Sequence, residues 1–316
     1  MMSGTLDHRD LAIMIVRPRP NWFRMLLIVR GSVLPAILPQ LLITLAFAVI
    51  VTLLHGRIFV WKVSLTFVPF SLIGLTLAIF LGFRNNTSYA RYWEARVLWG
   101  ELLNDTRSLA RQSLTLIDGS TQSRVFVHRL IAFVHALRHQ LRGTDPDPDL
   151  QRWLSESECA SLQGARYKPS AILLMAGEWL REQRQKGLLA APLAQAMEVH
   201  MGHLSDALGG CERIASTPIP FTYAVIIHRT VYVYCLLLPF GLLDSIGAMT
   251  PVIVTFIAYT FFALEALSSE IEEPFGTEPN DLPLDAMAEG IQTTLLELLG
   301  ERDLPAAPKP VNYVLT

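Results

Sequence analysis

The sequence predicts an all-α, multi-span membrane protein with four transmembrane helices and a helical cytosolic region. The composition is 51% hydrophobic and only 17% charged, whereas a soluble domain carries about 25% charged residues. The mean hydropathy is +0.36, and long uncharged runs recur along the chain. No segment alternates apolar and polar residues long enough to predict a sheet. This composition excludes a disordered chain, and the net charge of −2 gives no indication of nucleic-acid binding.

Four apolar segments are long enough to cross a bilayer. Val33–Leu54 and Val63–Phe83 contain 22 and 21 residues without a single charge. A helix of this length reaches about 30 Å, the thickness of the hydrocarbon core. Ile246–Leu264 is another uncharged run. Pro220–Leu243 is nearly as apolar apart from two basic residues near its middle, and we count it as a span as well.

The distribution of basic residues predicts the orientation, because cytoplasmic loops are enriched in Lys and Arg. The loop after the first span carries only Arg57 and Lys62, and the loop at residues 244–248 carries none. We therefore expect a multi-pass protein of the inner or plasma membrane with both termini in the cytoplasm. The basic residues on the predicted cytoplasmic side are Arg9, Arg17, Arg19, Arg24 and Arg30 before the first span, and Arg84, Arg91, Arg96, Arg107 and Arg111 after the second.

The spans divide the chain into four predicted parts. A cytosolic N-terminal segment and the first membrane hairpin occupy residues 1–83, and residues 84–217 form the helical cytosolic region. The second hairpin occupies residues 218–266, and a cytosolic C-terminal segment follows at residues 267–316. Within the cytosolic region the turn-forming sequence GTDPDPD at residues 143–149 interrupts the helical pattern. Apolar residues at helical spacing predict helices at residues 91–117, 125–141, 171–185 and 192–215.

No catalytic signature is present, so we predict that the protein is not an enzyme. The chain contains no phosphate-binding glycine loop, nucleophile elbow or HExxH motif. His128, His135 and His139 share one face of a predicted helix, and His200 and His203 are three residues apart on another. Either set could bind a metal, but a solvated or packed histidine face is more common. We therefore expect that no cofactor is required.

The two basic residues in the span at residues 220–243 are His228 and Arg229. A charged side chain at membrane depth costs several kcal/mol unless it faces a polar cavity or a partner. Two interpretations remain open: Arg229 is functional, or it pairs structurally with an acidic side chain such as Glu265.

The second span carries an apolar stripe. Leu75, Ile79 and Phe83 recur every four residues, so they lie on one face of a helix. Packing against lipid or another helix is the common role of such a stripe. In an oligomer with this face on its axis, the same stripe would form a narrow hydrophobic constriction that resists wetting and can gate ion flow.

Three separated segments, in the same order, resemble the bestrophin family and especially its bacterial members. The first is Gly82–Glu94 (GFRNNTSYARYWE), followed closely by Leu98–Gly100 (LWG). The second is Pro218–Phe221 (PIPF) at the start of the third span, and the last is Ile271–Asp285 (IEEPFGTEPNDLPLD) after the fourth. The resemblance covers most of the chain.

The resemblance implies a homopentameric ion channel with one axial pore in the lipid bilayer. Such a pore has a transmembrane neck lined by the second span and a second constriction in a cytosolic vestibule. Matching Gly82 and Arg91 to the family pattern assigns the three neck positions to Leu75, Ile79 and Phe83. The cytosolic aperture falls on an apolar residue of the helix that begins near residue 192, and we assign it to Leu193.

Eukaryotic members of the family bind calcium through an acidic run just after the Pro-Phe-Gly sequence. In this chain Thr277 and Pro279 interrupt that run and leave Glu278, Asn280 and Asp281. Calcium takes six to eight oxygen ligands, several of them from carboxylates. The interruption argues against calcium gating, and a solvated or interface charge cluster is the favoured interpretation of Glu272, Glu273 and Glu278.

The resemblance also bears on the permeating ion. An apolar neck offers no fixed counter-charge, so the sign of the ion must be selected in the vestibule, where helix N-termini favour anions and carboxylate rings favour cations. Chloride or other monovalent anions follow from the resemblance, and monovalent cations such as sodium remain open. Functions of other classes are a secondary transporter, for which no inverted repeat is visible, and a membrane-anchored sensor.

Overall fold

The computed structural model describes residues 14–15, 21–29, 31–58, 61–62, 65–117, 123–306 and 314–315. Within these ranges the chain is built from α-helices, with one 3₁₀ turn and four strands of two residues each, so the all-α prediction is confirmed. Of the basic residues that predict the orientation, Arg9, Arg17, Arg19 and Arg30 lie outside the described residues.

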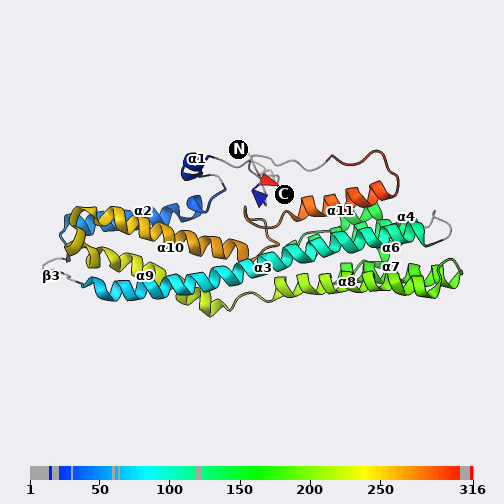
Figure 1. Ribbon diagram of the computed structural model, residues 1–316, viewed down its shortest axis with the longest axis horizontal. Helices are drawn as coiled ribbons and strands as arrows, with labels where there is room; N and C mark the ends of the chain where they lie inside the picture. The colour runs from blue at the N-terminus through cyan, green and yellow to red at the C-terminus, as the bar shows by residue number, and fades with distance from the viewer. Residues whose placement is uncertain are drawn as a thin grey trace, which may run out of the picture. The chain divides into compact units, whose positions relative to one another are not determined.

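The chain divides into two compact units. An apolar unit contains residues 17–92 and 218–273, and a polar unit contains residues 1–16, 93–217 and 274–316. The long helix α3, Phe67–Thr115, belongs to both, because its residues up to 92 fall in the apolar unit and the rest in the polar unit. Figure 1 shows α3 as one continuous helix. The C-terminal segment after residue 273 thus groups with the middle region of the chain.

The apolar unit contains the segments that resemble membrane spans. Within the part of the chain that the structure describes, three helical stretches are long and apolar enough to cross a membrane: Leu34–Leu53, Phe67–Thr115 and Phe221–Glu272. The last stretch includes two helices joined by a tight turn at Gly247, whose φ of 55° suits glycine. Besides the first part of α3, the elements are α1 (Trp22–Leu26), α2 (Leu34–Leu53), β2 (Arg57–Ile58), β3 (Trp61–Lys62), α9 (Phe221–Ile246), η2 (Gly247–Met249) and α10 (Thr250–Glu272).

Small residues let the helices of the apolar unit approach closely. A Cβ atom on Gly241 of α9 would lie 2.5 Å from the Phe70 ring of α3, and one on Gly74 would lie 2.8 Å from the Tyr234 hydroxyl. Helix α10 packs against α2 and α9. Proline stands in the first turn of α2 and of α10, where its missing N–H costs nothing.

The polar unit is a bundle centred on one amphipathic helix. Helix α4 is buried along most of its length, and its Phe126 ring stacks on Trp179 of α7 at 4.6 Å between ring centroids. A capping box between Ser155 and Glu158 begins α6. The elements other than α3 are β1 (Met14–Ile15), α4 (Ser123–Arg142), α5 (Asp147–Trp153), α6 (Glu156–Ser161), α7 (Lys168–Gln185), α8 (Ala191–Ser216), α11 (Leu284–Leu298) and β4 (Val314–Leu315).

The predicted helices are found with changes at their ends. The helix predicted from residue 91 is not a separate element but the continuation of the second apolar run in α3. The predicted turn at residues 143–149 ends early, because α5 begins at Asp147. Two antiparallel pairs of two-residue strands, β1 with β4 and β2 with β3, were not predicted. The number of membrane crossings and the four-part division of the chain stay predictions.

Candidate functional site

The apolar stripe of α3 faces away from the core of its unit. Leu75, Ile79 and Phe83 are 62%, 50% and 61% exposed, whereas Leu77 and Leu81 are 3% and 0% exposed. Residues two apart on a helix point about 200° apart, so the buried and exposed positions lie on opposite sides of α3. The stripe is therefore available to lipid or to further copies of the chain.

A polar layer follows the stripe on α3 and joins it to the end of α10. The Arg84 guanidinium lies 3.3 Å from a Glu272 carboxylate oxygen, and these side chains are 5% and 14% exposed. Arg91 Nε donates to the Glu272 carbonyl at 3.0 Å. The hydroxyls of Ser88 and Ser268 are hydrogen-bonded at 3.2 Å. The C-terminus of α10 is the negative end of its helix dipole, so the positive charges of Arg84 and Arg91 are favourable there.

Sequence reasoning missed this role for Glu272, which it treated as part of a solvated or interface cluster. A signal was present in the spacing of Arg84, Ser88 and Arg91, which places three hydrogen-bonding side chains on one face of α3. It indicates a polar contact but does not identify the partner, which lies 188 residues further along the chain.

An acidic side chain of α10 pairs with one of the two basic residues in the middle of α9. It is His228, not Arg229, that contacts Glu265, with 2.5 Å between His228 Nδ1 and the carboxylate oxygen. The His228 ring also lies 4.3 Å from the Tyr232 ring, centroid to centroid. Arg229 is exposed and makes no ion pair with any described residue. Of the two interpretations left open for Arg229, the pair with Glu265 is not formed among the described residues, because adjacent helix positions point about 100° apart and His228 is the one that faces α10.

The predicted aperture residue lies in the first turn of α8. Leu193 is 36% exposed, while Leu189 just before the helix is 2% exposed. The helix begins at Ala191 with a proline in its first turn. Leu193 is thus an apolar side chain left uncovered at a helix N-terminus.

The acidic residues after Pro274 form a turn. The Asp281 carboxylate accepts a hydrogen bond from the Glu278 backbone N–H at 2.7 Å, and Asp281 N–H donates back to the Glu278 carbonyl at 3.1 Å. Asp281 is fully buried. Its carboxylate is thus used by the backbone of the same loop, which gives it a structural role. Asn280 makes an interaction of its own. The sequence argues against calcium gating through Glu278, Asn280 and Asp281, and this stays a prediction.

Ionisable residues of α4 are used to hold the polar unit together. His135 is buried and its Nε2 lies 2.8 Å from Gln292 Oε1 of α11. Burial lowers the pKa of His135 to about 4. Burial raises the pKa of Asp149, but the hydrogen bond from His139 and the nearby positive charges outweigh it, so this pKa lies below its ordinary value. Arg138 bridges Asp149 and Asp285. His135 Nδ1 and His139 Nε2 both lie near the same Asp149 oxygen, at 3.7 and 3.0 Å, so these side chains hold α4 against α5 and α11.

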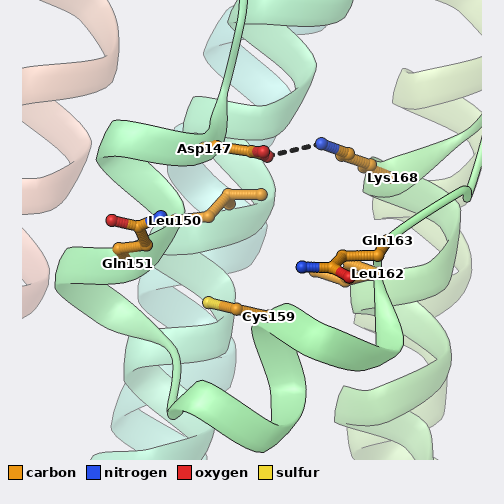
Figure 2. Close-up of a pocket in the computed structure, with 7 residues that line it drawn as sticks. All are labelled: Asp147, Leu150, Gln151, Cys159, Leu162, Gln163 and Lys168. Carbon is orange, nitrogen blue, oxygen red and sulfur yellow. Dashed lines mark hydrogen bonds and ion pairs between the residues drawn. The ribbon is translucent and has the colours of Figure 1, made fainter.

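A small cavity of about 50 Å³ opens between α5, α6 and α7 (Figure 2). Lys168 Nζ and Asp147 Oδ1 form an ion pair at 2.5 Å, and Cys159 is another lining residue. Burial raises the pKa of the Cys159 thiol, and the protonated thiol is a poor nucleophile. The cavity has room for only a few water molecules, and it gives no indication of catalysis.

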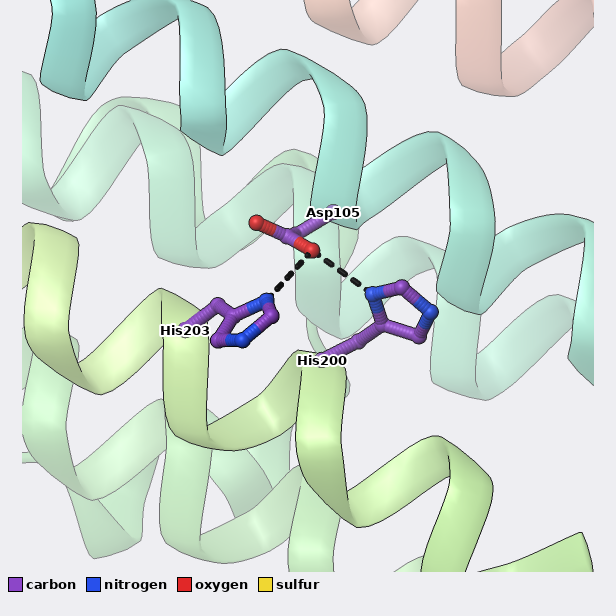
Figure 3. A group of neighbouring side chains, drawn as sticks. All are labelled: Asp105, His200 and His203. Carbon is purple, nitrogen blue, oxygen red and sulfur yellow. Dashed lines mark hydrogen bonds and ion pairs between the residues drawn. The ribbon is translucent and has the colours of Figure 1, made fainter.

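A second cluster lies between α3 and α8. Asp105 Oδ1 is 2.6 Å from His200 Nδ1 and 3.2 Å from His203 Nδ1. Figure 3 shows both rings turned toward the same carboxylate. Among the described residues, this is the only group of three or more His, Cys, Asp or Glu whose ligand atoms lie within 4.8 Å of one another. The sequence indicates the histidine pair but not the aspartate that joins it.

Comparisons with known proteins agree with the arrangement of the helices. The chain is 51% identical over 294 residues to a voltage-dependent anion channel-forming protein of Ralstonia nicotianae, covering 92% of this chain and 96% of that one. It is 43% identical over 304 residues to a protein of the same description from Escherichia coli K12, covering 96% and 100%. It also superposes on the crystal structure of a bacterial bestrophin homologue from Klebsiella pneumoniae with a TM-score of 0.82 at 41% identity, covering 84% of this chain and 99% of that one. Residues 14–297 match the family described as bacterial/fungal bestrophin protein, and the chain is a membrane protein that belongs to this family.

Proposed function

We propose that this protein is a homopentameric ion channel that passes chloride and other small anions passively through one axial pore. The observation that carries the proposal is the stripe of Leu75, Ile79 and Phe83, which is exposed along α3 while the opposite face of the helix is buried. Family membership supports the channel, and the names of the relatives in Ralstonia and Escherichia coli support the anion. No catalytic group enters this mechanism.

In the proposed pore each subunit contributes its stripe to a narrow apolar neck. An ion that enters such a neck must lose part of its hydration shell without gaining a counter-charge, so diameter and dehydration cost limit the flow. Weakly hydrated ions then pass more readily than strongly hydrated ones. When the neck is too narrow for water to fill it, ions cannot pass, and the neck acts as a closed gate.

The polar layer would keep the neck residues of each subunit at the same level in the pore. Arg84 and Arg91 tie α3 to the C-terminus of α10 directly after Phe83. Thr87 lies one turn after Phe83 on the same exposed face of α3, and its hydroxyl donates to the Phe83 carbonyl at 3.0 Å. A rigid α3 would hold the side chains of Leu75, Ile79 and Phe83 at fixed positions along the pore axis.

The proposed second constriction is Leu193 at the start of α8. The N-terminal turn of a helix carries unsatisfied N–H groups and a partial positive charge, which favours anions. Five such turns around one axis would select the sign of the ion where the apolar neck cannot. Leu193 would set the diameter at that point.

The proposal is tested by reconstituting the purified protein into planar bilayers and recording reversal potentials under a salt gradient. An anion channel gives a reversal potential displaced toward the chloride equilibrium potential, and a displacement toward the sodium potential shows cation conduction instead. Measuring the native mass of the detergent-solubilised protein tests the assembly separately. A monomer would rule out the axial pore.

A further inference from the structure

The cluster of Asp105, His200 and His203 is held by two closely packed antiparallel segments. Arg213 of α8 pairs with Glu94 of α3 at 2.5 Å. Further along the same pair, a Cβ atom on Gly210 would lie 2.8 Å from the Leu98 side chain. Successive contacts run toward the C-terminus of α3 and toward the N-terminus of α8: Glu94–Arg213, Leu98–Gly210 and Asp105–His203. The cluster therefore lies in a continuous contact between the two helices.

The donor atoms have the chemistry of a transition-metal site. Imidazole nitrogen and carboxylate oxygen bind Zn²⁺ at about 2.0–2.2 Å, and tetrahedral geometry then places the ligand atoms about 3.3 Å apart. His203 Nδ1 and Asp105 Oδ1 are 3.2 Å apart, and His200 Nδ1 is 2.6 Å from the same oxygen. The ligand atoms of all three residues lie within 4.8 Å of one another, so side-chain adjustments alone can bring them to the spacing of a metal site.

We propose that Asp105, His200 and His203 bind one divalent transition-metal ion, with Zn²⁺ the best match, across α3 and α8. Three protein ligands leave a fourth position for water. The side chain of His203 is 54% exposed and that of Asp105 is 11% exposed, so the ion reaches the site from solvent and the carboxylate is held on the protein side. The bound ion would fasten α8 to α3.

The other histidines of the polar unit do not compete for this role. His128 packs edge-on against the Trp153 ring, and His135 pairs with Gln292. His139 lies 3.0 Å from Asp149, which is also bound by Arg138. A cation beside the carboxylate disfavours a second positive ion there. At Asp105 the two partners are imidazoles, which can give up their Nδ1 protons to the solvent when a metal binds.

The test is a Zn²⁺ titration of the purified full-length protein in detergent after removal of metal with a chelator. We expect one saturable site per chain, a rise in melting temperature with Zn²⁺, and the visible absorption of a tetrahedral ion when Co²⁺ replaces Zn²⁺. His203→Gln, at an exposed position, and His200→Gln should each weaken binding more than about tenfold. His55→Asn is the control, because His55 lies outside the cluster at φ 52°, which Asn tolerates, and it should bind Zn²⁺ as the wild type does.

Two results would overturn the proposal. One is a wild-type protein without a saturable Zn²⁺ site, which would leave the cluster as a hydrogen-bonded triad only. The other is a His200→Gln/His203→Gln variant that elutes and melts normally in chelator yet binds Zn²⁺ with unchanged affinity. The Co²⁺ spectrum of the wild type needs no variant, so a poorly folded mutant does not prevent a decision.

Discussion

Single residues in this protein are often placed by one long-range polar contact. His135 shows the principle, since it is 3% exposed and hydrogen-bonded to Gln292 from a different helix. A buried polar side chain of this kind is stable only while its partner is present and its charge is absent. Its titration therefore reports on the folded state of the polar unit.

The first prediction concerns the pH dependence of stability. Burial lowers the pKa of His135 from 6.5 to about 4, so between these values the unfolded chain binds a proton that the folded chain does not. The contribution of His135 to the free energy of unfolding is then largest above pH 6.5 and falls, by up to about 3 kcal/mol, as the pH drops toward 4. Melting temperatures of the detergent-solubilised protein between pH 7 and 5 measure this fall.

The matched variant for this prediction is His135→Gln, which keeps a hydrogen-bonding side chain but cannot titrate in this range. Its melting temperature should fall less between pH 7 and 5 than that of the wild type. Equal falls in both proteins would show that other groups cause the acid instability.

At the scale of elements, the polar layer between α3 and α10 is the clearest joint in the apolar unit. Arg84 and Glu272 are both largely buried, and Arg91 adds a hydrogen bond to the last turn of α10. Removing one partner of a buried pair leaves the other charge buried without a partner. This lowers the free energy of unfolding by more than the intact pair contributes to it.

We therefore predict that Arg84→Gln destabilises the protein by about 3 kcal/mol. Arg124→Gln is the control, because the Arg124–Glu301 pair is 53% and 35% exposed and such surface pairs contribute about 0–1 kcal/mol. Thermal unfolding of the two purified variants gives the comparison. Similar losses in both would mean that the polar layer is not a buried joint.

At the scale of the whole molecule, one chain cannot form the proposed pore. The stripe on α3 is exposed in the single chain, and it would line the proposed neck only where copies of the chain meet around an axis. The same exposure would serve lipid contact, so the two roles are separated by conductance and not by the fold of one subunit.

The prediction at this scale compares two residues of the stripe with an exposed phenylalanine outside it. Phe83→Ala and Ile79→Ala should widen the neck and change single-channel conductance or open probability in planar bilayers. Phe256 of α10 is 69% exposed but lies outside the stripe, so Phe256→Ala should leave the current unchanged. If the pentamer stays intact and neither stripe variant alters the current, the assignment of the neck is wrong.

Several features of the fold and of the candidate site could be predicted from the sequence. The long uncharged runs predict the apolar helices, since a helix in lipid must satisfy its own backbone. The four-residue spacing of Leu75, Ile79 and Phe83 predicts a shared face, because helix geometry alone sets which residues align. These are local properties of the chain.

Other features were decided only by the tertiary structure. The pairing of His228 instead of Arg229 with Glu265 depends on how α9 is rotated against α10, and the salt bridge of Arg84 joins residues 188 apart. Asp105 meets His200 and His203 because α3 continues without a break past Phe83 and packs against α8. Local spacing determines which side chains share a helix face, but the packing of one helix on another determines what that face meets.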